Sequence, residues 1–457
     1  MDVINKKSLE VGTNKTVENY RVYKRRWFIL FIFFVLYFVG SIQWIQYTII
    51  EDVVMDYYGV SASTVNLTSV IFLLTYLPLI VPVSYVINKK GIRFSMIVAA
   101  TGHCIGSWIK VFSTHPNGFW IGFVGQTFVA VTQVFVVSMP AKFAGIWFDS
   151  TQMSTACTIA FYGSPMGIAM GYLITPKIVK QDRESVEETG NDLFLLFLII
   201  AIATTVVTVL IFVFFQEAPH IPPSEAQNTQ TQKSSKTLQS YKNLLTNGPF
   251  MTLLCAYALN IGVYNATSTL FNPILLEHFE GGGEFAGHIG VVFILSGIFS
   301  TVLFGVILDK TKRFKETTLG AYTMTAVGLL AYTFSVNSEH KLLIFLATFL
   351  FGFFANGYIP VAYEMGVELT YPESEFNSTG VLSTGSHTLG GLFTIFFTFL
   401  LNQTNGFWTN MGMVAFLVIG LILTICTPNI LKRQNALKKH LIRDNPNVEL
   451  AILPIKM

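Results

Sequence analysis

Long apolar runs separated by short polar segments make up most of this chain. Twelve such runs of about 20 residues follow one another, and about 20 residues is the length that crosses the hydrocarbon core of a bilayer as a helix. Charged residues, Gly or Pro bound each run. We predict one transmembrane helix for each, at residues 27–50, 63–87, 94–112, 119–141, 153–175, 193–215, 249–276, 286–308, 317–336, 342–363, 376–401 and 407–427.

One long polar segment divides the runs into two sets of six. Residues 216–248 are rich in Gln, Ser, Thr and Pro and hold too few apolar residues to form a core, so we predict a flexible cytoplasmic linker. The predicted fold class is an all-α membrane protein of two six-helix halves. Its parts are an N-tail (1–26), a first half (27–215), the linker (216–248), a second half (249–427) and a C-tail (428–457).

Charged residues are scarce and unevenly placed. They make up 12% of the chain, half of the roughly 25% that is usual in soluble proteins. If the N-terminus is cytoplasmic, 24 of the 29 Lys and Arg residues fall on the cytoplasmic side, which is a strong positive-inside signal. We therefore expect both termini in the cytoplasm. The C-tail, with five basic residues between 432 and 443, is either an amphipathic helix on anionic lipid or a solvated tail.

Two loops repeat at a constant offset and indicate that the halves are related. The segment SYVINKKGIRF follows the second run, and GVILDKTKRF follows the eighth run 221 residues later. Asp149 and Glu373 each stand five residues before a Ser-Thr pair, 224 residues apart. The GVILDKTKR segment resembles the signature loop of the major facilitator superfamily, in which such residues latch neighbouring helix ends. The predicted latch residues are Asn88, Arg93, Asp149, Asp309, Lys310, Arg313 and Glu373.

The predicted spans contain one charged residue, Lys110. A charge inside the bilayer is costly and by default functional, so the absence of a carboxylate or an Arg at the midplane argues against carboxylate-driven proton coupling and against anionic cargo. His103 and His387 stand alone in their spans, and each is either a hydrogen-bonding polar group or a proton relay. No paired carboxylates, metal-binding cluster or nucleophile–base pair stands out, so we expect neither catalysis nor a cofactor. The net charge of +3 gives no reason to expect a nucleic-acid partner.

Neutral polar residues interleaved with aromatic ones form the candidate binding site. Aromatic faces attract organic cations without a formal counter-charge, and Gln or Asn side chains can bond a hydroxyl or an amine. The alternative is that these residues join helices to one another or form the aromatic belt of the membrane interface. Trp44 and Tyr264, 220 residues apart, take nearly equivalent places in the two halves. The candidates on the first and seventh runs are Gln43, Trp44, Gln46, Tyr47, Tyr264 and Asn265.

Four segments resemble the feline leukaemia virus subgroup C receptor-related (FLVCR) family, solute carrier family 49. They are GSIQWIQYTIIEDVVMDYYGVSASTVN, LTYLPLIVPVSYVINKKGIRF, STACTIAFYGSPMG and VAYEMGVELTYPESEFNSTGVL. The resemblance implies the major facilitator fold and facilitated diffusion of choline and ethanolamine, with haem export as an older assignment for part of the family. It also implies residence in the plasma membrane or an organellar membrane. We expect a monomer in the lipid bilayer.

The resemblance also implies a substrate cage. Its members would be Trp44, Gln133 in the fourth run and Tyr264, while His387 stands where the family has a Gln in the eleventh run. Three functions remain open: a uniporter for choline-like cations, a haem or porphyrin exporter, and a transporter fold that acts as a receptor or sensor.

Overall fold

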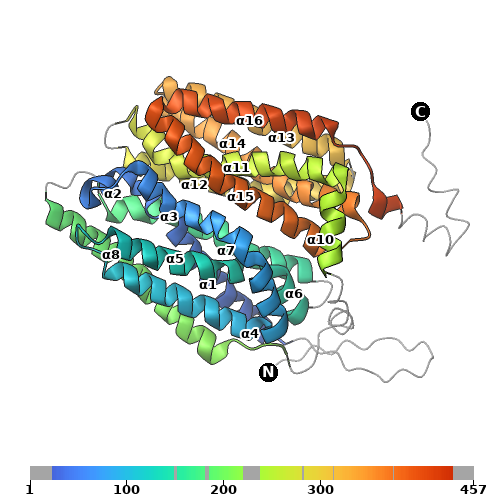
Figure 1. Ribbon diagram of the computed structural model, residues 1–457, viewed down its shortest axis with the longest axis horizontal. Coiled ribbons are helices and arrows are strands. Elements are labelled where there is room, and N and C mark those ends of the chain that lie inside the picture. Colours follow the sequence, from blue (N-terminus) through green and yellow to red (C-terminus); the bar gives the residue numbers. More distant parts are fainter. Residues whose placement is uncertain are drawn as a thin grey trace, which may run out of the picture.

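Two bundles of helices lie side by side in the computed structural model, which describes residues 23–148, 152–180, 185–219, 237–279, 282–311, 313–373 and 375–435. Every regular element in these ranges is a helix. In Figure 1 the helices up to α8 form the lower bundle and those from α10 onward form the upper one. This confirms the all-helical membrane fold predicted from the sequence.

The first half contains nine helical elements, three of which (η1, α2 and α6) have at most eight residues. They are α1 (Arg25–Ile45), η1 (Thr48–Ile50), α2 (Glu51–Tyr58), α3 (Ala62–Leu74), α4 (Tyr76–Val111), α5 (Phe119–Val137), α6 (Pro140–Trp147), α7 (Met153–Ile178) and α8 (Val186–Phe214). The second half contains α10 (Thr237–Thr246), α11 (Gly248–Leu276), α12 (Gly283–Thr311), α13 (Phe314–Asn337), α14 (Lys341–Thr370), α15 (Glu375–Gln403) and α16 (Gly406–Cys426).

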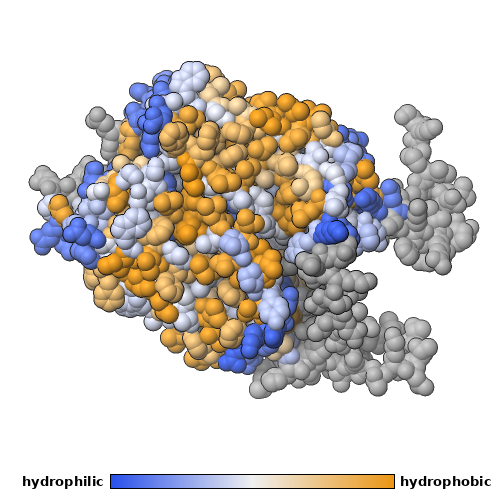
Figure 2. All heavy atoms as spheres, viewed as in Figure 1, coloured by the Kyte–Doolittle hydropathy of each residue, from blue (hydrophilic) through white to orange (hydrophobic). Residues whose placement is uncertain are grey.

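Within the described ranges, ten helical segments are long and apolar enough to cross a membrane, or up to 11 if the bent pair α10–α11 is one span. The predicted runs number twelve because one segment of 50 residues, Ala62–Val111, contains the second and third runs together. Each of the other runs overlaps a segment of its own. Hydrophobic residues cover the middle of the molecule, and hydrophilic ones gather toward its two ends (Figure 2).

The second and third runs meet at Gly91, inside α4. Gly91 has φ 85° and ψ 177°, so the helix is broken there. The carboxylate of Glu217 accepts hydrogen bonds from the backbone N–H groups of Ile92 (2.9 Å) and Arg93 (2.8 Å). These groups begin the second part of α4, and a carboxylate complements the positive end of a helix dipole. A side chain at residue 91 would overlap with the carboxylate, which is a second reason for Gly at this position.

The last part of the predicted linker differs from the prediction. Residues 237–246 form helix α10, which meets α11 at an angle of 83°. Leu244 is buried and Tyr241 packs against the core of the second half. The apolar side chains of YKNLL therefore bind this end of the linker to the second half, although its overall composition is polar.

Hydrogen bonds join the two halves along α7 and α12, where Tyr162 bonds Thr301 (3.2 Å), and also at one end of the bundle. We call the end at which α1 begins the proximal end, and the end that carries α2 the distal end (Figure 1). Helix α3 packs on α15, and α7 packs on α12. At the distal end Asn272 donates to Asp52 (2.9 Å) and Asn66 donates to Thr398 (3.3 Å). The two halves are therefore held together distally by side chains from both.

Candidate functional site

Trp44 lies one residue before the end of α1, with its indole against the neighbouring helices of the first half. The side chain is 8% exposed and packs with Phe72 and Leu73 of α3 and with Val129 and Ala130 of α5. Its Nε1–H donates a hydrogen bond to the carbonyl oxygen of Ser69 (3.2 Å). The polar edge of the ring is thereby satisfied, as a buried indole requires, and the orientation of the ring is fixed by α3.

The residue that binds the indole also reaches the other half. Ser69 Oγ lies 3.2 Å from Thr269 Oγ1 of α11, and Thr269 Oγ1 in turn donates to the carbonyl oxygen of Asn265 (3.1 Å). A short chain of hydrogen bonds therefore connects Trp44 of the first half with Asn265 of the second. Trp44 and Asn265 therefore lie on the two sides of one contact between the halves.

His387 forms a second contact between the halves. Its imidazole stacks on Tyr76 of α4, with ring centroids 4.6 Å apart, and its Nδ1 lies 2.7 Å from the carbonyl oxygen of Ser383. One turn along α15, a β-carbon at Gly391 would lie 2.7 Å from Leu74. Gly391 and His387 lie one turn apart on α15. This part of α15 is therefore close to Leu74 of α3 and Tyr76 of α4.

Trp44, Asn265 and His387 therefore converge where α3 meets α11 and α15, and we call this place the α3–α11–α15 junction. Gly390 completes it, since a β-carbon there would lie 2.8 Å from Asn265 Nδ2. The indole of Trp44 lies against α3, the amide of Asn265 lies beside Gly390 of α15, and the imidazole of His387 lies against Tyr76 of α4. Such a group offers aromatic faces and neutral hydrogen-bonding atoms to a small polar molecule.

Gln133 lies on α5, and its hydrogen bonds stay within the first half. Its Nε2 donates to Ser41 Oγ (3.2 Å), and Ser41 Oγ donates to Ser164 Oγ (3.0 Å). Its Oε1 has no hydrogen-bond partner among the described residues. A buried acceptor of this kind needs a partner, so Gln133 retains an atom that can bind water or a substrate hydroxyl.

Tyr264 points toward a different neighbour. Its ring stacks on Phe293 of α12 at a centroid distance of 4.5 Å, whereas Trp44 packs against α3 and α5. The two aromatic residues occupy corresponding helices of the two halves, as their spacing suggested. The hydrogen-bonded chain from Trp44 reaches Asn265, the neighbour of Tyr264, and not Tyr264 itself.

Gln43, Gln46 and Tyr47 are buried, and Gln43 and Tyr47 contact other helices of the first half. Gln43 Oε1 accepts hydrogen bonds from Ser107 Oγ (3.1 Å) and from Lys110 Nζ (2.5 Å), both on α4. Tyr47 packs against Phe197 of α8. The side chain of Gln46 is buried and has no hydrogen-bond partner among the described residues. The structure thus directs Gln43 and Tyr47 to partners other than those of Trp44, although the sequence groups them with it.

The predicted latch of the first half is partly visible. Asn88 Oδ1 accepts a hydrogen bond from Lys142 Nζ of α6 (2.8 Å), and the backbone of Arg93 is held by Glu217. Asp149 lies outside the described residues. Burial lowers the pKa of Lys142, and the charge of Glu217 opposes this shift.

The latch of the second half shows a different partner. Glu373 accepts hydrogen bonds from Ser240 (2.5 Å) and Asn243 (2.8 Å), both on α10, and these bonds lower its pKa. Lys310 lies at the end of α12, and Arg313 follows it and lines a surface groove of about 390 Å³. The side chain of Asp309 is outside the described part of the chain.

The described part of the C-tail is bound to helix α14. Arg433 pairs with Glu368 (Nε–Oε1, 3.2 Å) and with Glu364 (Nη2–Oε2, 2.5 Å), both near the end of α14. The backbone N–H of Gln434 also donates to Glu368 (3.2 Å). The sequence left the tail as a lipid-bound helix or a solvated segment, and at residues 433 and 434 it is an ion-paired segment instead.

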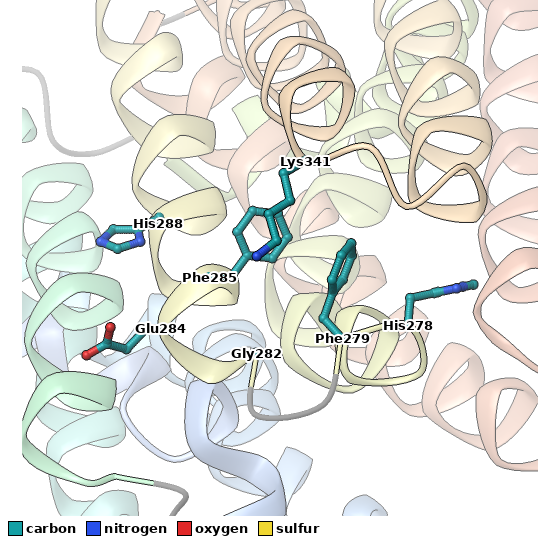
Figure 3. Close-up of a pocket in the computed structure, with 7 residues that line it drawn as sticks. All are labelled: His278, Phe279, Gly282, Glu284, Phe285, His288 and Lys341. Carbon is teal, nitrogen blue, oxygen red and sulfur yellow. The ribbon is translucent and has the colours of Figure 1, made fainter.

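A pocket formed by described residues lies elsewhere, at the distal surface of the second half. In Figure 3 Lys341 extends beside Phe285 and Phe279, while Glu284 and His288 point away from them. The Lys341 ammonium lies 5.6 Å from the ring centroid of Phe279 and 5.3 Å from that of Phe285. The pocket has a volume of about 550 Å³ and is lined by His278, Phe279, Gly282, Glu284, Phe285, His288 and Lys341. None of the predicted site residues lines it, so we assign the candidate site to the α3–α11–α15 junction.

The sequence analysis missed three residues of that junction. Tyr76 supports His387, and Ser69 and Thr269 connect the two halves. Tyr76 carries a usable signal, because it is an aromatic residue in the middle of the second predicted run. Ser and Thr are frequent in the other runs as well, so Ser69 and Thr269 carry no signal of this kind.

The chain is similar to known membrane transporters over most of its length. The family model described as Major Facilitator Superfamily matches residues 29–395. The chain is 39% identical over 440 residues to the choline/ethanolamine transporter flvcr2a of Danio rerio, with 95% of this chain and 93% of that protein covered. It is 37% identical over 424 residues to the choline/ethanolamine transporter FLVCR2 of Homo sapiens, covering 92% and 80%.

A solved structure shows the same fold at low identity. The crystal structure of a D-xylose-proton symporter superposes with a TM-score of 0.69 at 12% identity, covering 89% of this chain and 97% of that one. This likeness concerns the arrangement of the helices alone.

Proposed function

Because the chain belongs to the major facilitator superfamily and, within it, to the FLVCR family, we propose that it carries choline, ethanolamine or a similar small organic cation across a membrane. The proposed mechanism is facilitated diffusion with alternating access. The observation that carries the proposal is the identity of 33–39% with proteins named as choline/ethanolamine transporters.

The chemistry of the α3–α11–α15 junction supports a cationic cargo. Trp44 supplies an aromatic face, which attracts quaternary ammonium groups, and Asn265 and His387 supply neutral polar atoms. Gln133, with its free Oε1, would accept a hydrogen bond from a substrate hydroxyl or amine. Tyr264 would add a second aromatic face when the halves rearrange. The proposal involves binding and movement without any covalent step, so we infer no catalytic activity.

The hydrogen bonds between the halves support a carrier that is closed at its distal end. With the charge distribution of the loops, we propose that the distal end faces outward and that both termini are cytoplasmic. The plasma membrane is the proposed location, and the protein would act as a monomer. Residues 27–215 and 249–427 would move as two units, and the latch residues Asn88, Arg93, Asp149, Asp309, Lys310, Arg313 and Glu373 would stabilise one state at the proximal end.

Uptake of radiolabelled choline by cells that express the protein tests the proposal. We expect Trp44→Ala to lower uptake tenfold or more, because a desolvated cation–π contact contributes about 2 kcal/mol. Trp44→Phe should retain part of the uptake. Trp408→Ala is the matched control, since Trp408 is exposed on α16.

Unchanged uptake by Trp44→Ala at equal surface expression would exclude Trp44 from the site. A thermal-shift panel on the purified protein separates the cargo classes. We expect choline and ethanolamine to raise the melting temperature and their phosphorylated forms to leave it unchanged. Stabilisation by haemin alone would overturn the proposed substrate.

A further inference from the structure

Lys110 is a charged residue in the interior of the first half. It lies in the last turn of α4, its side chain is 1% exposed, and it forms no ion pair within the described residues. A buried ammonium without a counter-ion is costly unless its hydrogen bonds are satisfied. The partners of this residue are therefore informative about what it does.

Two glutamine side chains satisfy Lys110. Its Nζ donates to Gln43 Oε1 of α1 (2.5 Å) and to Gln126 Oε1 of α5 (3.0 Å). One ammonium therefore ties α4 to two other helices. Ser107, one turn before Lys110, donates to the same oxygen of Gln43 (3.1 Å).

The chemistry of Lys110 fixes which way Gln126 points. An ammonium has donors only, so it selects the oxygen of the Gln126 amide and turns the NH₂ group away. That NH₂ group donates to the backbone carbonyl oxygens of Gln43 (2.6 Å) and Thr68 (3.3 Å). The ammonium at one side of the amide and the two carbonyl oxygens at the other therefore select the same orientation, and Lys110 reinforces it.

The two carbonyl groups that Gln126 joins belong to the residues just before Trp44 and Ser69. The indole N–H of Trp44 is hydrogen-bonded to the carbonyl oxygen of Ser69. Gln126 therefore fastens α1 to α3 at the point where the indole is fixed, and Lys110 orients Gln126.

We propose that Lys110 is a positioning residue of the substrate site, which acts through Gln126 and Gln43 to hold the indole of Trp44 against α3. This deepens the proposed function and rests on it for the identity of the cargo. Lys110 does not touch the cargo. Its contribution is a rigid indole, so that binding of a cation does not first have to order the ring.

The sharpest variant is Gln126→Glu. A carboxylate keeps an acceptor for Lys110 and forms a stronger pair with it, but it has no NH₂ group for the carbonyl oxygens of Gln43 and Thr68. A purely stabilising role of Lys110 predicts normal uptake in this variant. Positioning predicts a KM for choline at least fivefold higher, with Vmax per surface molecule within twofold of the wild type.

Lys110→Met removes the donors at nearly constant length, and Lys110→Arg restores them. We expect Met to raise the KM at least fivefold and Arg to return it at least halfway to the wild-type value. Lys341→Met, on the distal surface, is the matched control and should change nothing. If Lys110 acts through the indole, the KM of the double variant Lys110→Met/Trp44→Phe should equal that of Trp44→Phe alone.

A fluorescence measurement tests the positioning independently of transport. The emission of each protein minus that of its Trp44→Phe derivative isolates the signal of Trp44. In Gln126→Glu and Lys110→Met this difference spectrum should be red-shifted and broadened relative to the wild type. An unchanged difference spectrum together with an unchanged KM in Gln126→Glu would overturn the proposal. If the wild type takes up no choline but the spectra shift, the positioning stands and the proposed cargo fails.

Discussion

Gly40 is a position on α1 at which the absence of a side chain matters. An added β-carbon would lie 2.5 Å from Gln133 Oε1 and 2.5 Å from Cε1 of His103. Both of these side chains are buried in the first half. The close approach of α1, α4 and α5 therefore depends on this glycine, and Gln133 is held beside it.

We predict that Gly40→Ala reduces choline uptake at least fivefold, because Gln133 and His103 must both move to make room for the methyl group. Gly305→Ala on α12 is the matched control, since a β-carbon there meets nothing within 4 Å. Ala exceeds Gly in helix propensity by about 1 kcal/mol, so the control should be slightly stabilised. Equal uptake by the two variants at equal surface expression would contradict this account.

At the residue scale, the sequence points to residues whose chemistry is visible in the residue type, and their role in binding stays a prediction. Trp44 and His387 were identified as unusual, and the structure places both at contacts of the junction. Prediction failed for direction: Gln43 and Trp44 are neighbours in sequence, yet Gln43 faces Lys110. Neighbouring positions on a helix point about 100° apart, and only the packing of α4 and α5 reveals which direction leads to the other half.

At the scale of the element, the segment after α16 is fastened to α14 by two unequal carboxylates. The side chain of Glu368 is fully buried, whereas that of Glu364 is 47% exposed. A carboxylate without access to water depends on its partner far more than a solvated one does. The pair Arg433–Glu368 is therefore the stronger anchor of the C-terminal segment.

We predict that Arg433→Met destabilises the protein by about 3 kcal/mol, because it leaves a buried carboxylate without its cation. Glu364→Gln, at the exposed carboxylate, should cost less than about 1 kcal/mol. Thermal unfolding of the purified proteins in one detergent measures the difference. Equal melting temperatures for the two variants would show that burial does not set the strength of this anchor.

A helix could be predicted from the sequence where a long apolar run alone determines it. The long runs were identified because a bilayer needs about 20 apolar residues. Helix α10 was missed because its apolar residues are few and act only through docking on the second half. The break at Gly91 was expected as a loop, yet its backbone is held by Glu217, 126 residues further along the chain. No local pattern indicates such a partner.

At the scale of the whole molecule, transport requires the distal contacts to open. Asn66 and Thr398 face each other across the halves, so a covalent bridge there would prevent the movement. Trp108 and Thr205 also face each other (Nε1–Oγ1, 2.9 Å), but both belong to the first half. A bridge between them would leave the movement of the halves free.

We predict that a short bis-methanethiosulfonate linker, which joins Cys residues at 66 and 398 through disulfides, abolishes choline uptake and that reduction of these disulfides restores it. The native cysteines, of which Cys255 and Cys426 are exposed, would first be replaced by Ser. The same linker between Cys residues at 108 and 205 is the control and should leave uptake intact. Persisting uptake by a fully linked 66–398 pair would rule out opening of the distal end.

Lys110, the one charged residue of the twelve predicted runs, has an electrical consequence. Lys110 is bound to α1 and α5 of its own half, so it accompanies that half and crosses no barrier of its own. In a carrier of choline, the cation itself is then the net charge that crosses the membrane. Each transport cycle moves one elementary charge. A membrane voltage of 100 mV acts on one such charge with about 2.3 kcal/mol, enough to hold roughly a fifty-fold gradient. A carrier without any coupled ion would thus still concentrate its substrate on the negative side, with the resting potential of the cell as the source of energy.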